Sequence, residues 1–118
     1  PTYVWADEFM IDEVFVNYLS NARNHVLKNG RIAISFQRIE NDLRVTVFNS
    51  GSHIPEEDLD KLWVKFYKVD KARTREYGGS GIGLSIVAAT MKAHGKQYGV
   101  NNVEGGVEFY FDVDCANA

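Results

Sequence analysis

The sequence predicts a two-layer α/β sandwich, in which helices pack on one face of a mainly antiparallel sheet. Two pairs of segments alternate apolar and polar residues around short turns, which is typical of β-hairpins and therefore of antiparallel pairing. Two other segments carry apolar residues at helical spacing on one side only, and such a stripe must be buried against a second layer. The chain has 118 residues, so we expect residues 1–118 to form a single domain.

The first elements are a helix and a hairpin. The helix runs from about Asp7 to Lys28, and Gly30 is its candidate C-cap. Its apolar residues recur at three- and four-residue steps, namely Ile11, Phe15, Leu19, Ala22 and Val26. The hairpin joins residues 31–39 ("RIAISFQRI") and 43–50 ("LRVTVFNS") through "END". The preceding "PTYVW" is either an edge strand or the remnant of a longer N-terminal segment.

The second half of the chain repeats this order. A proline followed by acidic residues predicts a short helix beginning at Pro55. Lys68 to Tyr77 has no usable period and is interpreted as a mobile loop. Ile82 to His94 has a helical pattern. Residues 97–102 and 107–113 flank a glycine pair and predict the second hairpin.

Composition excludes several classes of protein. The formal net charge of −3 argues against a dedicated nucleic-acid binder. The single cysteine, Cys115, excludes an internal disulfide and a multi-cysteine zinc site. There is no apolar run of membrane-spanning length and no signal peptide. We therefore expect a cytosolic domain.

A glycine-rich loop precedes the second long helix. Four glycines fall among the six residues from Gly78 to Gly83, and such a loop at a helix start suits a phosphate. The segment from Lys61 to Arg75, just before it, holds six of the 13 Lys and Arg. Leu84 stands where a P-loop needs lysine and where the protein-kinase loop needs glycine, and no strand precedes the loop as a Rossmann fingerprint requires. The remaining interpretations are a lid over a nucleotide or a flexible linker before an ordinary helix.

Two groups of polar residues suit a nucleotide. Glu13, Asn17 and Asn21 are spaced by four and share one helix face. Asparagine oxygens are hard ligands that can complete the coordination of a phosphate-bound Mg²⁺, although a polar helix edge facing water would look the same. Asn49 ends a strand just before Gly51, where its side chain could accept a hydrogen bond from a base amino group. The alternative is a plain strand-ending turn.

Taken together, these stretches resemble the catalytic ATP-binding domain of bacterial sensor histidine kinases. "NYLSNA" resembles the N box, "NSGSHIP" the first glycine box, "LWVKFYKVDKAR" the F box and "GGSGIGLSI" the second glycine box. The resemblance extends from about Asp7 to Val113 in the family's order. The superfamily, known as GHKL or by its Bergerat fold, also holds the ATPase domains of gyrase, a heat-shock chaperone and a mismatch-repair protein.

The resemblance implies a mixed sheet with about three helices on one face and ATP with Mg²⁺ held between the helices and a flexible lid. It implies that Asn21 is the magnesium ligand, that Asn17 assists, and that Asn49 holds the adenine amino group while Gly51 lets the base approach. The other implied ATP-binding residues are His25, Ile54, Lys68, Gly79, Gly81, Ile82, Gly83 and Leu84. The implied lid anchors are Trp63, Phe66 and Tyr67.

Three positions depart from the family's pattern. Asn49 replaces the usual aspartate, Asn24 replaces a frequent lysine or arginine, and Val107 replaces the usual threonine after a glycine. The first and third departures concern the adenine pocket, and the second removes one expected phosphate contact. None of them removes the implied magnesium or phosphate contacts.

The resemblance implies phosphoryl transfer rather than hydrolysis. ATP-hydrolysing members of the superfamily carry a glutamate at the position of Asn17, and an amide is no general base. None of His25, His53 and His94 fits the phosphoacceptor, which in this family lies on a separate dimerisation domain. The chain should therefore bind ATP and donate its γ-phosphate to that histidine, with no catalytic residue of its own and with a response regulator downstream.

The resemblance also implies that the parent protein is a membrane-anchored homodimer in the bacterial cell membrane, with this chain as a cytoplasmic domain that does not bind nucleic acid. Two alternatives remain open. One is an anti-sigma-type serine kinase of the same superfamily. The other is a degenerate nucleotide-binding interaction module without transfer, which Asn49 and Val107 make plausible.

Overall fold

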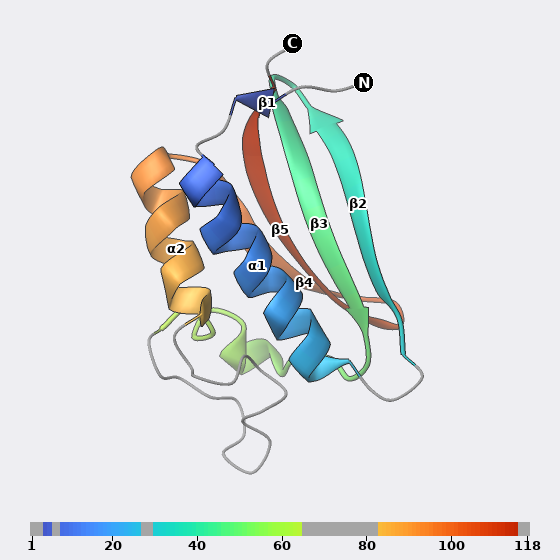
Figure 1. The fold of residues 1–118 in the computed structure, drawn as a ribbon. Helices are drawn as coiled ribbons and strands as arrows, with labels where there is room; N and C mark the ends of the chain where they lie inside the picture. The colour runs from blue at the N-terminus through green and yellow to red at the C-terminus, as the bar shows by residue number, and fades with distance from the viewer. Residues whose placement is uncertain (1–3, 6–7, 27–29, 65–82, 116–118) are drawn as a thin grey trace.

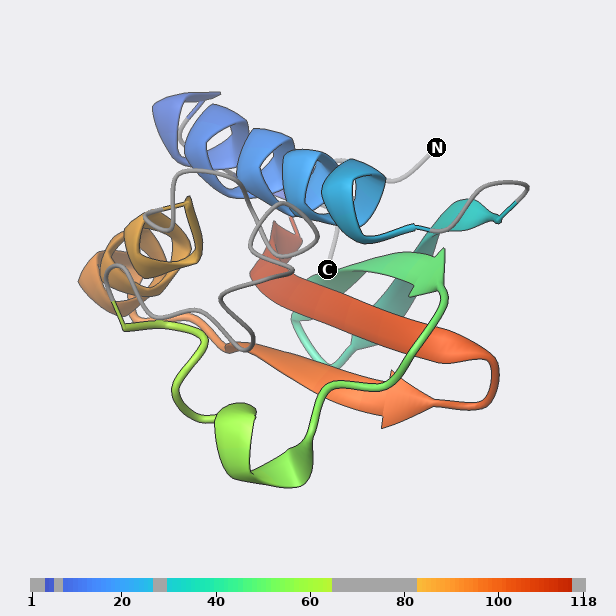
Figure 2. The same ribbon diagram turned by 90° about the horizontal axis from the view of Figure 1, so that it is seen from below.

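Two α-helices, α1 (Glu8–His25) and α2 (Gly83–His94), lie on one face of a five-stranded sheet in the described part of the chain (Figure 1). The computed structural model describes residues 4–5, 8–26, 30–64 and 83–115. The view from below shows both helices on the same side of the sheet (Figure 2). The predicted two-layer α/β sandwich is confirmed.

The sheet is built around its last strand, β5 (Gly106–Cys115). Strand β3 (Asp42–Ser50) pairs with one edge of β5, and β2 (Ile32–Ile39) follows β3. The other edge of β5 pairs with β4 (Tyr98–Val103) and with the short β1 (Val4–Trp5). Both predicted hairpins and the N-terminal edge strand are therefore present. Every pairing among the described strands is antiparallel, so the mixed sheet implied by the resemblance is not found there.

The core lies between the helices and the inner face of the sheet. Alternation along β3 and β5 sends every second side chain inward, because successive side chains of a strand point to opposite faces. The helices contribute the other half of the core through one stripe each. The buried apolar residues of these four elements include Val14, Tyr18, Val45, Val47, Val87, Met91, Val107, Phe109, Phe111 and Val113.

The predicted helix at Pro55 is instead a 3₁₀ helix, η1 (Glu56–Asp58). Pro55 is its N-cap, as the sequence suggested, but the backbone bonds from here to Val64 span three residues rather than four. Leu62 is buried and Trp63 packs on the core, so tertiary contacts hold this segment without an α-helix. The described part of the sheet is thus covered by two α-helices and not by three.

The side chain of Lys96 bridges the start of β3 and the end of β5. Asp42 and Asp114 face each other in the pairing of β3 and β5, where like charges would repel. The Lys96 ammonium bonds to Asp114 and, at 2.9 Å, to Asp42. These hydrogen bonds, which Lys96 donates to Asp114 and to Asp42, raise the pKa of Lys96, and the bond to Asp114 has the larger effect. The bridge lies at the end of the β3–β5 pairing opposite to Ser50 and Gly106.

Two of the predicted segments extend beyond the described residues. The first helix was expected from Asp7 to Lys28, and α1 is described from Glu8 to His25; Asp7 and Lys28 lie outside the described residues. The loop predicted from Lys68 to Tyr77 lies outside them as well. Within the described ranges, no helix combines the length and the apolar character needed to cross a bilayer.

Candidate functional site

The helix α1 directs an asparagine into the protein interior. Asn21 is 2% exposed, and its Oδ1 has no hydrogen-bond partner among the described residues. Buried polar atoms are normally satisfied, so such an atom needs an explanation. The rotation of α1 about its axis is fixed by Tyr18, whose fully buried hydroxyl donates to the Tyr110 carbonyl at 2.9 Å. Burial raises the pKa of Tyr18, so its hydroxyl keeps the proton that it donates.

The first residue of α2 lies against the same face of α1. A Cβ placed on Gly83 would lie 2.9 Å from Asn17 Oδ1, so only glycine allows this approach without a shift of the amide. The Asn17 Nδ2 donates to the Glu13 carbonyl within the helix. Leu84 is buried in the core and fixes the first turn of α2. The helix face that carries Asn17 therefore lies against Gly83, the last glycine of the glycine-rich loop, as the sequence predicted.

The start of α2 has the properties of an anion site. The first N–H groups of a helix have no partner within the helix, and the helix dipole places partial positive charge there. The described residues of the first turn carry no acidic side chain that would occupy these donors. A phosphate beside Gly83 and Leu84 would satisfy them.

Asn49 is the second buried amide. It lies on β3, is fully buried, and faces Val107 of β5 in the strand pairing. Its Oδ1 has no hydrogen-bond partner among the described residues, and its Nδ2 lies 3.4 Å from the Ser50 carbonyl. Gly51 follows with φ 138°, which residues with a side chain rarely adopt. The first glycine box is therefore a turn beside a buried amide oxygen that no described residue pairs.

Side chains from both layers hold this turn in place. His25, at the end of α1, donates from Nε2 to the Ser52 carbonyl at 3.1 Å. Asn102 of β4 accepts from the Ile54 N–H at 2.9 Å and donates to the Ile54 carbonyl at 2.8 Å. His53 bonds through Nε2 to the Val103 carbonyl at 2.7 Å, so it is a loop residue that fastens the turn.

Asn102 was not among the predicted site residues. It continues the inward alternation of Tyr98 and Val100 on β4, so a polar residue at that position was the signal available in the sequence. His25 and Ile54 were predicted to line the nucleotide. Both take part in holding the turn, with Ile54 2% exposed, and their contact with a nucleotide stays a prediction.

Trp63, a predicted lid anchor, packs on aromatic residues of the sheet. Its ring makes edge contacts with Tyr98, at 5.0 Å between centroids, and with Phe109, at 6.0 Å. The other lid and loop residues predicted for the site lie outside the described residues, namely Phe66, Tyr67, Lys68, Gly79, Gly81 and Ile82. Their roles stay predictions.

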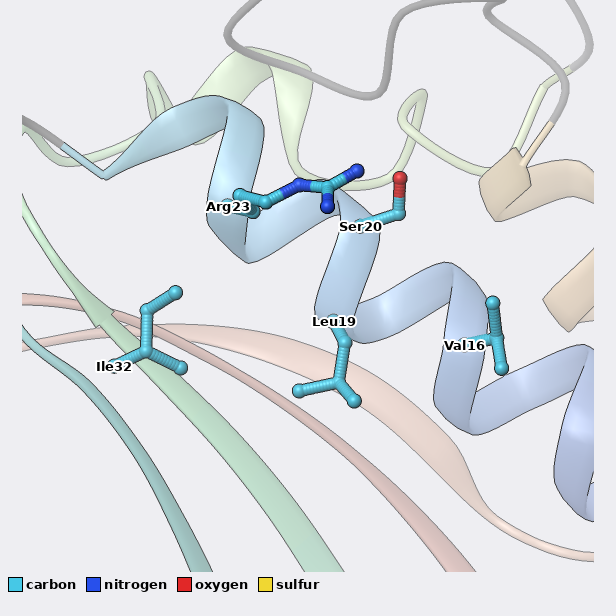
Figure 3. Close-up of a pocket in the computed structure, with 5 residues that line it drawn as sticks. All are labelled: Val16, Leu19, Ser20, Arg23 and Ile32. Carbon is cyan, nitrogen blue, oxygen red and sulfur yellow. The ribbon is translucent and has the colours of Figure 1, made fainter.

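A hollow of about 330 Å³ lies on a different face of α1. Val16, Leu19, Ser20 and Arg23 of α1 line it together with Ile32 of β2 (Figure 3). Its lining is mainly apolar and includes neither buried asparagine nor the start of α2. It is therefore separate from the candidate nucleotide site.

The candidate ligands for a metal ion at this site are amide oxygens. The described residues contain no group of three or more His, Cys, Asp and Glu placed to hold a metal ion. A cation at this site would thus be held by amide oxygens of the protein and by phosphate oxygens of the ligand, and such phosphates commonly contribute to the coordination of Mg²⁺.

Residues 6–117 match the family described as "Histidine kinase-, DNA gyrase B-, and HSP90-like ATPase". Over 105 residues the chain is 37% identical to the sensor histidine kinase WalK of Bacillus subtilis, covering 87% of this chain and 17% of that protein. It is 36% identical over 110 residues to the sensor protein VanSB of Enterococcus faecalis, covering 93% and 25%. The chain spans a quarter or less of the length of these two relatives.

Solved structures share the fold. The catalytic domain of histidine kinase ThkA, in a nucleotide-free form, superposes with a TM-score of 0.80 at 33% identity, covering 94% of this chain and 70% of that one. Full-length ShkA in complex with AMPPNP gives 0.82 at 25% identity, covering 100% and 24%. ThkA in complex with the response regulator protein TrrA gives 0.71 at 30% identity, covering 94% and 30%. The fold is that of histidine kinase catalytic domains.

Proposed function

Because this chain belongs to the histidine kinase-, DNA gyrase B- and HSP90-like ATPase family, we propose that it is the catalytic ATP-binding domain of a two-component sensor kinase. In that role it binds ATP with Mg²⁺ and donates the γ-phosphate to a histidine on a separate dimerisation domain. One observation carries the proposal: the buried Asn21 Oδ1, which has no hydrogen-bond partner among the described residues, lies on the same helix face as Asn17, which contacts the first residue of α2. The AMPPNP complex of ShkA supports a nucleotide as the ligand.

The buried amide of Asn21 fits a magnesium ion. Its oxygen is a hard ligand without a partner among the described residues, and a cation would supply the missing interaction. Asn17 would assist through its Oδ1. When bound, Mg²⁺ would neutralise charge on the triphosphate and so favour transfer of the γ-phosphoryl group.

The other residues of the site have separate tasks. The N–H groups at the start of α2, from Gly83 and Leu84, hold phosphate oxygens. Asn49 hydrogen-bonds the base. The turn that follows Asn49 is fixed by His25 and Asn102, so the base site and the phosphate site keep their separation.

Asn17 favours transfer over hydrolysis. Activating a water requires a group that can take a proton, and a carboxamide cannot do so near neutral pH. Its Nδ2 is already bonded to a helix carbonyl. Phosphoryl transfer depends mainly on positioning and charge stabilisation, which the two amides and the helix start can provide without a base.

The proposed partners follow from the relatives. WalK and VanSB are sensor proteins, and ThkA has been solved with a response regulator. They support a parent protein that contains a dimerisation domain with the phosphoacceptor histidine and that passes the phosphoryl group to a response regulator. We place that parent, as a homodimer, in the bacterial membrane with this domain on the cytoplasmic side.

Labelled ATP provides the test. The chain is mixed with the dimerisation domain of its parent protein, Mg²⁺ and γ-labelled ATP, and transferred label is characterised by its chemical stability. We expect label that is labile in acid and stable in alkali, as a phosphohistidine is. Acid-stable label would favour the serine kinase, and ATP binding without any transfer would favour the interaction module. Asn21→Ala should abolish transfer, whereas Ser20→Ala, on the neighbouring face of the same helix, should not.

A further inference from the structure

The orientation of the Asn49 side-chain amide at the proposed base site is held by few contacts. Asn49 and Val107 face each other across β3 and β5, and both are fully buried. Val107 has no polar side-chain atom that could hold the amide of Asn49. The contact from Asn49 Nδ2 to the Ser50 carbonyl is long at 3.4 Å, and Oδ1 has no partner among the described residues. The amide is therefore confined in position but weakly held in orientation.

A carboxamide presents two kinds of group from the same place. Its oxygen accepts hydrogen bonds and its nitrogen donates them, and a half-turn about the last side-chain bond exchanges the two. At Asn49 this half-turn replaces the long contact of Nδ2 with the Ser50 carbonyl by one of Oδ1 with that carbonyl, and at 3.4 Å the penalty should stay below the value of one ordinary hydrogen bond. A carboxylate at the same position could only accept.

Purines differ at the atom that such a group would meet. Adenine carries an amino group at position 6, which donates, whereas hypoxanthine carries an oxo group there, which accepts. Asn49 can match the first with Oδ1 and the second with Nδ2. Strong rejection of a related ligand arises when the buried group that faces it cannot pair with it, and here the amide has a matching group for either purine.

We propose that this domain binds 6-amino and 6-oxo purine nucleoside triphosphates with similar affinity, because the Asn49 amide adapts to either. The inference rests on the proposed function, in which Asn49 faces the base. It goes further by extending the nucleotide substrates beyond ATP.

Calorimetric titration of the chain with Mg-ATP and with Mg-ITP tests this proposal, since the two nucleotides differ only at position 6 and in the protonation of the adjoining ring nitrogen. We expect the two dissociation constants to agree within about tenfold, the equivalent of one ordinary hydrogen bond. Asn49→Asp should raise the preference for ATP at least about tenfold by weakening ITP, since a carboxylate repels the oxo group. Asn101→Asp, at an exposed position of β4, should leave the ratio unchanged.

Asn49→Leu keeps the proposal testable if the buried aspartate prevents folding. Removing both hydrogen-bonding groups should weaken ATP and ITP by similar factors. A wild-type preference for ATP of tenfold or more would overturn the proposal, as would an unaltered ratio in a folded Asn49→Asp variant or undiminished binding in Asn49→Leu. If neither nucleotide binds the wild-type chain, the proposed function itself fails.

Discussion

Replacing Asn21 by alanine should change stability and ligand binding in opposite directions. Its buried Oδ1 has no hydrogen-bond partner in the described part of the chain, and leaving such a group without a hydrogen bond costs about 1–3 kcal/mol in the ligand-free protein. Alanine is also the better helix former by roughly 0.5 kcal/mol. The void left by the missing carboxamide offsets part of this gain, by on the order of 1 kcal/mol.

The net expectation is that the ligand-free Asn21→Ala variant is more stable than the wild type by about 1 kcal/mol, and a change of this size in a domain of this length raises the melting temperature by roughly 4 °C. Saturating Mg-ATP should reverse the order. At a ligand concentration about 100 times the dissociation constant, the wild type gains about 2.7 kcal/mol, and the variant should gain almost nothing because it lacks the proposed metal ligand.

Thermal unfolding followed by circular dichroism, with and without Mg-ATP, measures both effects in one experiment. Ser20→Ala is the matched control, since Ser20 lies on α1 but lines the hollow between α1 and β2 (Figure 3). It should keep the full nucleotide-induced shift. An Asn21→Ala variant that unfolds at least 5 °C below the wild type, or that keeps the shift, would refute the assignment of Asn21 as a ligand-facing amide.

Three further variants test the framework of the site. Asn102→Ala removes both hydrogen bonds to Ile54, which form a clamp between β4 and the turn, and should lower the free energy of unfolding by about 2 kcal/mol, measured in urea. A loss below about 0.5 kcal/mol would show that this clamp contributes little to stability. Gly106→Ala would overlap the backbone oxygen of Asn49 and should lower the free energy of unfolding by about 3 kcal/mol or prevent folding, and an unchanged urea midpoint would contradict this. Lys96→Met should destabilise the chain at neutral pH. Because folding raises the Lys96 pKa above its usual 10.5, the melting difference from the wild type should persist up to that pH and vanish as pH rises through the higher folded value; a constant difference would oppose this account.

Local patterns predicted most of the fold because they are physical consequences of short-range sequence. The apolar stripe of α1 and the alternation in β3 and β5 each occur within one segment, so they can be read without knowledge of the partner. The acidic run after Pro55 predicted the place of a short helix but not its type. The packing of Leu62 and Trp63 on the core holds that segment in 3₁₀ turns instead.

The site was predictable in part for the same reason. The spacing of Asn17 and Asn21 places them on one helix face, and the structure brings that face to Gly83. The clamp from Asn102 to Ile54 depends on residues 48 positions apart, and no local pattern encodes it. The two departures at the base site likewise came from distant segments, and only the strand register shows that they are a single facing pair.

The hydroxyl of Tyr18 ties α1 to the main chain of β5 from within the core. Together with the buried apolar stripe of α1, this bond holds the orientation in which the helix presents its amides, and it is present without a nucleotide. The site is then preorganised on this side, so little orientational entropy is lost there on binding. Removal of that hydroxyl in Tyr18→Phe should therefore make the orientation of the Asn21 side chain less well defined, although Tyr18 is not a proposed ligand contact.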